Sequence, residues 1–351
     1  MGHPISKVAY TPVSYILSAL GQPLISGGLL AAITVPSPLR DTVCNAVQTG
    51  APIHIVHLRS ILFGILFLGS VRTASRVLDH RANTNESRSA SSRWNFPNEI
   101  AVLTGGCGGI GKSIAGLLSA RGIQVAVLDI QASPPEFDEN PNIHYFYCDI
   151  TSQRSVRDVA QQIRDTLGEP SVLVNNAGIS HRKSIIELSR ANLEQTFQVN
   201  AIAHWTTCQE FLPAMIAANK GHIVAVASLA AFGAMPLQGD YAATKSAILA
   251  FHECLIGELK HIHKVDGILN SVVCHGWTRT PIIAKWGPKI SEGAMDPERV
   301  ATRVVEHVVE CVGGQSFVPE SLGPLSITRA LPLWLQAVVR DAAWKLMMNK
   351  A

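Results

Sequence analysis

The chain has 351 residues, is 47% hydrophobic and carries a formal net charge of +3 at neutral pH. Only 16% of its residues are charged, against about 25% in typical soluble domains, so part of it is expected to meet lipid or another apolar surface. The near-neutral balance and the lack of a basic run argue against nucleic acid as a partner.

The cysteines argue against a disulfide framework and against a metal site. There are seven, an odd number, and none forms a CxxC pair. We therefore expect reduced thiols in a domain that faces the cytosol, and no bound metal.

Two apolar stretches, residues 13–35 and 53–71, precede residue 80. The second contains Arg59 and can span a bilayer only if this arginine snorkels or pairs. The arginines that follow, with few acids among them, favour a cytosolic position for this side: Arg72, Arg76, Arg81, Arg88 and Arg93. We predict a membrane-associating region over residues 1–80, as a span or as a hairpin that dips in from one face, and a linker over 81–96. A cleaved targeting peptide is the alternative.

Short apolar segments alternate with helical stretches from residue 97 to about residue 315. The expected strands are IAVLTGG, IQVAVLDI, NIHYFYCDI, SVLVNNAG, GHIVAVASLA and ILNSVVCHG. This alternation predicts an α/β fold with a doubly wound parallel sheet of the Rossmann type, covered by helices on both faces. Residues 316–351 are expected to form an apolar C-terminal helix or tail.

A glycine-rich segment, TGGCGGIG at residues 104–111, joins the first expected strand to the first helix. Glycines at such a turn let the backbone approach a pyrophosphate at the helix N-terminus. Asp129 ends the second strand, where an acid binds ribose hydroxyls and repels a 2′-phosphate. The sequence thus favours NAD as cofactor, with NADP as the alternative; a simple cap at the strand end is the other interpretation of Asp129.

Tyr241 and Lys245 stand four residues apart in GDYAATKSAIL, so both side chains lie on one face of a helix. By itself this spacing is more typical of a surface helix. Together with TGGCGGIG, NNAG at residues 175–178 and Ser228, however, it resembles the short-chain dehydrogenase/reductase family over residues 97–315. The apolar ends resemble the membrane-bound branch that oxidises retinol, steroids and long-chain alcohols.

The resemblance implies a role for each matching residue. The implied cofactor-binding residues are Gly105, Gly109, Ile110, Gly111, Asp129, Asp149, Ile150, Asn176, Gly178, Tyr241, Lys245 and Thr280. The implied catalytic residues are Asn200, Ser228, Tyr241 and Lys245. Tyr241 would be the acid/base, Lys245 would lower its pKa, Ser228 would bind the substrate oxygen and Asn200 would hold a water.

Two features of the chain bear on the substrate. His275-Gly276 stands where the family has Pro-Gly, and the imidazole either reaches the active site or points to solvent or neighbouring side chains. The segment 281–296, with Ile282, Ile283 and Trp286, is expected to form a mobile lid, and its apolar residues suit a lipophilic substrate. Packing on the core or against a membrane is the alternative for these side chains.

These observations predict an enzyme that transfers a hydride between NAD and an alcohol or ketone of a small lipophilic substrate. We expect a membrane-associated protein at the endoplasmic reticulum or lipid droplets, with a cytosolic catalytic domain, and the resemblance allows a homodimer. The alternatives are an NADPH-dependent carbonyl reductase and a catalytically silent membrane scaffold.

Overall fold

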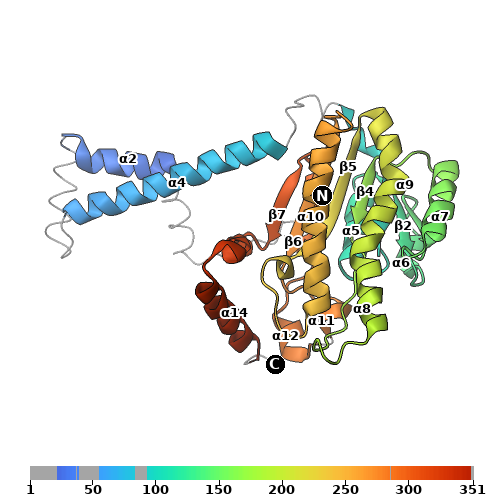
Figure 1. The fold of residues 1–351 in the computed structure, drawn as a ribbon. Coiled ribbons are helices and arrows are strands. Elements are labelled where there is room, and N and C mark those ends of the chain that lie inside the picture. The colour runs from blue at the N-terminus through green and yellow to red at the C-terminus, as the bar shows by residue number, and fades with distance from the viewer. Residues whose placement is uncertain (1–21, 37, 39–54, 84–92, 285, 349–351) are drawn as a thin grey trace. The chain divides into compact units, whose positions relative to one another are not determined.

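The computed structural model describes residues 22–36, 38, 55–83, 93–284 and 286–348. They belong to two compact units that divide between Ala82 and Asn83 (Figure 1). Part of the first apolar stretch and most of the predicted linker lie outside the described residues. The helix before that linker continues to Asn83, so the first residues assigned to the linker are helical.

The described part of the first unit includes the helices α2 (Pro23–Thr34) and α4 (Ile55–Asn83). They pack against each other: the position of a Cβ on Gly27 in α2 lies 3.6 Å from the Leu66 side chain in α4. Arg59 donates hydrogen bonds from Nη2 and Nε to the carbonyl oxygen of Ile33, at 2.6 and 3.1 Å. The guanidinium therefore satisfies a carbonyl at the end of α2 that has no partner within the helix.

Within the described residues, His57–Ser75 of α4 is the one stretch whose length and apolar composition would allow it to cross a membrane. Arg59 lies inside it and donates its hydrogen bonds to Ile33; an arginine within a membrane would need such a partner.

The second unit is built on a seven-stranded sheet with the order β3-β2-β1-β4-β5-β6-β7, and every neighbouring pair is parallel. The strands are β1 (Ile100–Thr104), β2 (Gln124–Asp129), β3 (Ile143–Tyr147), β4 (Val172–Asn175), β5 (Gly221–Ser228), β6 (Ile268–His275) and β7 (Gly314–Val318). The predicted doubly wound parallel sheet is confirmed. The strand order reverses between β1 and β4, and crevices for ligands form beyond the carboxyl ends of strands at such a point.

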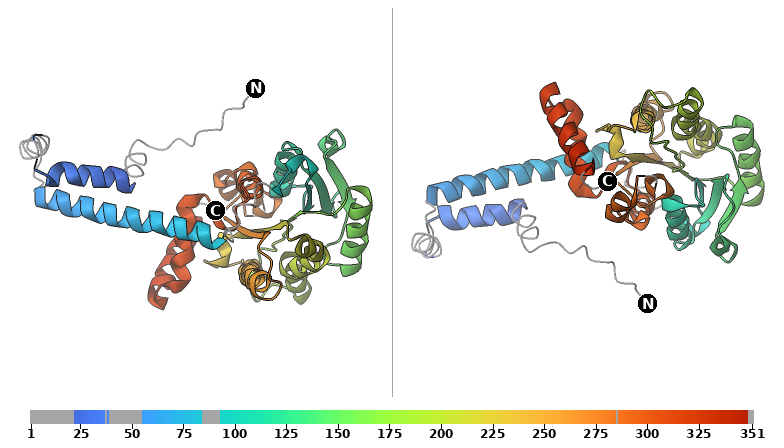
Figure 2. Two further views of the ribbon diagram at one scale, coloured as in Figure 1. Left: turned by 90° about the horizontal axis from the view of Figure 1, so that it is seen from above. Right: turned by 90° about the horizontal axis from the view of Figure 1, so that it is seen from below.

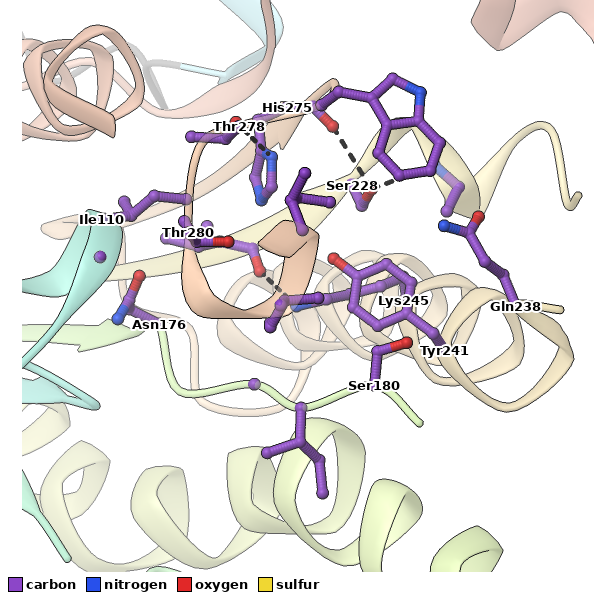
Figure 3. A pocket seen from close by; sticks show the side chains of 18 of the residues that line it. Ile110, Asn176, Ser180, Ser228, Gln238, Tyr241, Lys245, His275, Thr278 and Thr280 are labelled. Atoms are coloured by element: carbon purple, nitrogen blue, oxygen red, sulfur yellow. Dashed lines mark hydrogen bonds between the residues drawn. The ribbon is translucent and has the colours of Figure 1, made fainter. Parts of the chain in front are cut away.

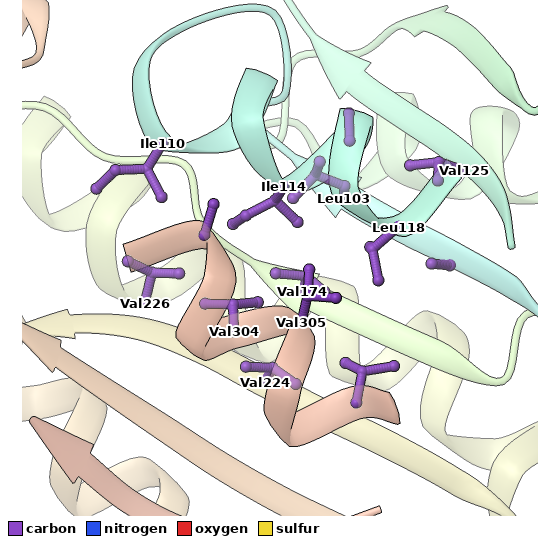
Figure 4. Close-up of a cluster of buried hydrophobic side chains, with 14 of the residues drawn as sticks. Leu103, Ile110, Ile114, Leu118, Val125, Val174, Val224, Val226, Val304 and Val305 are labelled. Carbon is purple, nitrogen blue, oxygen red and sulfur yellow. The ribbon is translucent and has the colours of Figure 1, made fainter. Parts of the chain in front are cut away.

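Helices cover both faces of the sheet (Figure 2). One face carries α5 (Gly109–Ser119) and α13 (Pro297–Val309), and the other carries α7 (Gln153–Thr166), α9 (Ala203–Ala218) and α10 (Gly239–His261). Figure 4 shows Ile114 and Leu118 of α5 meeting Val304 and Val305 of α13 over the central strands. Because apolar layers cover both faces, the strands are continuous apolar runs rather than alternating ones.

The remaining elements complete the described part of the second unit. They are η2 (Phe96–Asn98), α6 (Pro135–Asp138), α8 (Arg190–Phe197), the π-helical turn η3 (Gln198–Ile202), η4 (Leu229–Ala231), α11 (Pro281–Ala284), α12 (Pro288–Gly293), η5 (Glu320–Ala330) and α14 (Leu333–Met348). The π-turn η3 thus separates the helices α8 and α9.

The seventh strand, β7, was not among the expected strands, and it crosses the predicted domain boundary at residue 315. Its sequence, GQSFV, is short and mostly half-buried at the edge of the sheet, so it lacks the apolar run that marks the inner strands.

Candidate active site

A cavity of about 770 Å³ lies at the carboxyl ends of the strands. Its walls come from the loop after β1, the ends of β2, β5 and β6, the first turns of α10 and the C-terminal elements η5 and α14. Figure 3 shows that Ser228, Tyr241, Lys245, His275 and Thr280 converge on this space from three elements and a loop.

One end of the cavity is formed by the glycine loop. Gly105 and Gly109 have φ angles of +65° and +53°, a region that favours glycine. A Cβ at Gly111 would lie 2.0 Å from the Gly105 carbonyl oxygen and 2.6 Å from Asn176 Nδ2. The backbone can therefore turn this tightly only with glycine at position 111, which leaves an open cradle at the N-terminus of α5.

Asn176 holds this loop from the neighbouring strand end. Its Nδ2 donates to the carbonyl oxygens of Thr104 and Gly105 at 3.1 and 2.9 Å, and its backbone N–H donates to the Thr104 hydroxyl at 3.0 Å. Gly178, two residues on, lies where a Cβ would be 3.6 Å from Asn200 Oδ1 and 3.7 Å from Lys245 Nζ.

The Asp129 carboxylate is buried at the end of β2 and borders the cavity. Its oxygens accept hydrogen bonds from the backbone N–H groups of Cys107 and Gln131, at 2.9 and 3.0 Å. Asp129 therefore fixes the glycine loop as well as presenting negative charge to the cavity. Asp149 and Ile150 line the same end, and Asp149 Oδ1 accepts from Thr151 N at 2.9 Å.

Tyr241 and Lys245 lie one turn apart near the start of α10, and both are buried. The ammonium Nζ of Lys245 is 5.6 Å from the centre of the Tyr241 ring. It donates to the carbonyl oxygen of Val226 in β5 at 2.7 Å. This bond fixes the lysine beneath the tyrosine.

The electrostatics of this pair differ from the expectation that Lys245 lowers the tyrosine pKa. Burial raises the pKa of Tyr241 to about 12, and the facing Ser228 hydroxyl acts in the opposite direction. Burial likewise lowers the pKa of Lys245 to about 8. Removal from water is thus the largest influence on the pKa of both groups.

Ser228 ends β5 and lies beside His275, its partner in the register with β6. Its hydroxyl donates to the His275 carbonyl oxygen at 3.3 Å and accepts from Ala230 N at 3.2 Å. Thr280 stands across the cavity, with its Cγ2 3.2 Å from the position of a Cβ on Gly109. The glycine loop, Thr280, Ser228 and Tyr241 all line this one cavity.

Asn200 occupies the π-turn between α8 and α9 and is fully buried. Its Oδ1 accepts from Ile179 N at 2.8 Å, and its Nδ2 donates to Ile179 O and Thr244 Oγ1 at 2.9 and 3.1 Å. The side chain thus joins the loop after β4 to α10, where Tyr241 and Lys245 stand.

The far wall of the cavity was not assigned from the sequence. It is formed by Leu322, Leu325, Thr328, Val339, Arg340 and Ala343 of η5 and α14. The apolar composition of the C-terminal tail was the available signal, but it did not distinguish a pocket wall from a membrane or dimer contact.

The segment expected to form a lid folds into α11 and α12 over this region. Ile282, Ile283 and Ile290 line the cavity. Trp286 instead is buried and packs edge-on against Trp277, with their ring centres 5.2 Å apart. Trp286 therefore contributes to packing of the segment rather than to the cavity wall.

Among the described residues, no group of three or more histidine, cysteine, aspartate or glutamate side chains is placed to hold a metal ion.

Comparison with known proteins identifies the class of this site. A family model described as short chain dehydrogenase matches residues 99–291. Dehydrogenase RED2 of Cochliobolus heterostrophus is 34% identical over 222 residues, which are 63% of this chain and 83% of that protein. Estradiol 17-beta-dehydrogenase 11 of Homo sapiens is 30% identical over 256 residues, 71% of this chain and 84% of that protein.

Two further comparisons agree. Epidermal retinol dehydrogenase 2 of Homo sapiens is 29% identical over 227 residues, 62% of this chain and 73% of that protein. The ligand-free aldohexose dehydrogenase of Thermoplasma acidophilum shares the fold, with a TM-score of 0.55 and 21% identity over 63% of this chain and 92% of that chain. The chain therefore belongs to the short-chain dehydrogenase family of oxidoreductases, which act on alcohol groups.

Proposed function

We propose that this protein is an NAD-dependent dehydrogenase of lipophilic alcohols in which Tyr241 is the acid/base. The observation that carries the proposal is the convergence of Tyr241, Lys245 and Ser228 on one cavity that also contains the glycine cradle. This arrangement brings a proton-transferring hydroxyl and a dinucleotide cradle to the same space.

The residues present fit a nicotinamide dinucleotide. Gly105, Gly108 and Gly109 line the cavity at the N-terminus of α5, where helix N–H groups favour an anion such as a pyrophosphate. Asp129 lines the same cavity, where its carboxylate would hold the adenosine ribose hydroxyls. A bound dinucleotide supplies the hydride acceptor and, when oxidised, a positive charge that favours the tyrosinate.

Four side chains of the site have separate roles in the proposed reaction. Tyr241 takes the hydroxyl proton of an alcohol on oxidation and returns it on reduction. Ser228, opposite the tyrosine, hydrogen-bonds the substrate oxygen and orients it. Lys245 holds a positive charge beneath the ring, 5.6 Å from its centre, and Asn200 fixes the loop after β4 against α10.

NAD is favoured over NADP because a buried carboxylate stands at the end of β2. A 2′-phosphate placed beside Asp129 would meet negative charge in a poorly solvated position. An NADPH-dependent carbonyl reductase is the second candidate, because the same side chains can run the reaction in reverse.

A lipophilic substrate is supported by the apolar side chains that line the cavity, among them Ile282, Ile283, Leu322 and Val339. Two relatives are named for estradiol and for retinol, which are both apolar alcohols. Membrane association, through the apolar stretch His57–Ser75, would bring the enzyme to where such substrates partition. A position at the endoplasmic reticulum or at lipid droplets is consistent with this proposal.

The test is NADH formation by the full-length protein in membranes or detergent, with retinol, steroid alcohols and long-chain alcohols. We expect activity with NAD, and a loss of about 10²–10⁴-fold in kcat for Tyr241→Phe, which keeps the ring and removes the hydroxyl. The protein is expected to stay with the membrane fraction after a carbonate wash.

Activity that survives Tyr241→Phe unchanged would refute the assigned acid/base. Activity with NADP alone would overturn the cofactor assignment and favour the reductase. Cofactor binding without turnover of any substrate in either direction would favour the membrane scaffold.

A further inference from the structure

His275, which replaces the proline common in the family, ends β6 beside the candidate catalytic serine. Its carbonyl oxygen accepts the hydrogen bond from Ser228 Oγ at 3.3 Å. The ring lines the cavity together with Tyr241, Lys245 and Thr280 (Figure 3). The ring thus lies at the site, and it also contacts a neighbouring side chain, that of Thr278.

Hydrogen bonds determine which ring nitrogen carries the proton. Nδ1 lies 2.7 Å from the carbonyl oxygen of Gly276, which can only accept, so Nδ1 must donate. Thr278 Oγ1 lies 3.1 Å from the same nitrogen and also contacts the Gly276 carbonyl oxygen. These contacts hold the ring in one orientation and leave a lone pair on Nε2.

Nε2 is available to a ligand. In the part of the chain that the structure describes, no protein group hydrogen-bonds to it. Burial lowers the pKa of His275 to about 4; the hydrogen bond to the Gly276 carbonyl opposes this, and the nearby Lys245 adds a smaller lowering, so the ring is neutral near pH 7. The cavity wall therefore contains a fixed, uncharged hydrogen-bond acceptor.

The position of this acceptor indicates which group it binds. In the proposed function, the dinucleotide extends from Asp129 past the glycine loop towards Tyr241. His275 and Thr280 border the Tyr241 end, where the cofactor presents its nicotinamide. At that end the N–H donor of the cofactor is the carboxamide.

We propose that Nε2 of His275 accepts a hydrogen bond from the nicotinamide carboxamide, which makes His275 a cofactor-positioning residue. A proline at this site has no side-chain acceptor and could not form the bond. The inference rests on the proposed function, since it requires a nicotinamide at this end of the cavity.

The test measures binding by calorimetry with the detergent-solubilised full-length protein and three ligands. They are NAD, its acetylpyridine analogue, in which an acetyl group replaces the carboxamide and removes its N–H, and ADP-ribose, which lacks the nicotinamide. The two variants are His275→Asn, which keeps a donor at the place of Nδ1 and lacks Nε2, and His275→Gln, whose amide oxygen can take the place of Nε2.

We expect His275→Asn to weaken NAD binding about three- to tenfold, the range of one neutral hydrogen bond. Its affinities for the acetylpyridine analogue and for ADP-ribose should equal those of the wild type. His275→Gln should recover most of the NAD affinity.

Equal weakening of all three ligands by His275→Asn would show a displaced loop and overturn the inference. Unchanged NAD binding would overturn it as well. If the wild type binds NAD and Tyr241→Phe abolishes activity, while His275→Asn leaves NAD binding unchanged, the proposed function would stand and this inference alone would fail.

Discussion

Asp129 has two tasks at the residue scale, and they constrain what a substitution can reveal. Its carboxylate accepts hydrogen bonds from the N–H groups of Cys107 and Gln131 and so shapes the glycine loop. It also faces the cavity, where it would meet the cofactor ribose. A single substitution at this position therefore changes both the charge in the cavity and the geometry of the glycine loop.

Asp129→Asn and Asp129→Ser separate these effects. Asparagine keeps an acceptor for one backbone N–H and removes the charge, whereas serine also makes room for a phosphate. We expect the ratio of kcat/KM for NADP to that for NAD to rise about tenfold with asparagine and further with serine, because a nearby negative charge no longer opposes the 2′-phosphate. Steady-state kinetics with both cofactors measure it, and an unchanged ratio in both variants would remove Asp129 from cofactor selection.

At the scale of elements, the close packing of the N-terminus of α5 against the loop after β1 requires a glycine at position 111. Gly111 faces the carbonyl of Gly105 and the amide of Asn176. Gly116, in the same helix, is exposed and has no heavy atom within 4 Å of the position of its Cβ. The two glycines therefore provide a matched pair of sites.

Gly111→Ala is expected to lower the free energy of unfolding by about 1–3 kcal/mol or more and to abolish dinucleotide binding, because backbone atoms must move. Gly116→Ala should raise the free energy of unfolding by about 1 kcal/mol through helix propensity and leave binding intact. Urea denaturation and NADH fluorescence titration check both. Equal behaviour of the two variants would contradict the close packing described at Gly111.

The C-terminal helix α14 forms part of the cavity wall. Ala343 lines the cavity, while its neighbour Ala342 is exposed. Trp344 packs against the cluster of Ile283, Trp286 and Ile290, which fixes the helix against α11 and α12. A substitution at position 343 should therefore act on the space for the substrate.

Ala343→Phe is expected to raise KM for a bulky alcohol about tenfold or more and to leave the NAD dissociation constant unchanged, because the added ring fills the far end of the cavity. Ala342→Phe serves as the control on the exposed side. Kinetics with a short and a long alcohol measure the effect. A similar response of the two variants would show that α14 does not border the substrate.

At the scale of the whole molecule, the buried histidines make stability depend on pH. Burial lowers the pKa of His222 to about 3 and of His252 to about 4, and it lowers that of His204 well below its usual value. Their unfolded-state pKa is about 6.5. Between these values the unfolded chain binds protons that the folded protein does not, so folding is favoured less as the pH falls.

We therefore expect the free energy of unfolding to decrease as the pH is lowered from about 6.5 towards 4, by about 1.4 kcal/mol per pH unit for each such histidine. Urea denaturation of the full chain at pH 7.5 and 5.5 measures this. His222→Gln, which keeps a polar group near Ser271 and does not titrate, should make the decrease shallower. Equal stability at the two pH values would contradict the burial of neutral histidines.

Local pattern was sufficient for much of the fold and of the candidate site. The first six strands of the chain are mostly apolar runs, and the helices between them have the usual length, so the parallel sheet is readable without tertiary information. The residues of the glycine loop are close to one another in sequence, and so are Tyr241 and Lys245. Their spacing alone therefore predicts the tight turn and the shared helix face. The edge strand β7 and the π-turn at Asn200 have no such pattern, because neighbouring elements stabilise them.

The sequence by itself determined the parallel α/β fold, the glycine-rich turn after β1 and the placement of Tyr241 and Lys245 on one face of a helix, because each depends on periodicity or short spacing. Tertiary structure alone decided the hydrogen bonds of Asp129 to the glycine loop, the inward ring of His275 and the placement of α14 in the cavity wall. These contacts join residues that are distant in sequence or depend on the exact packing of a turn. Their geometry exists only once the sheet has aligned its strand ends.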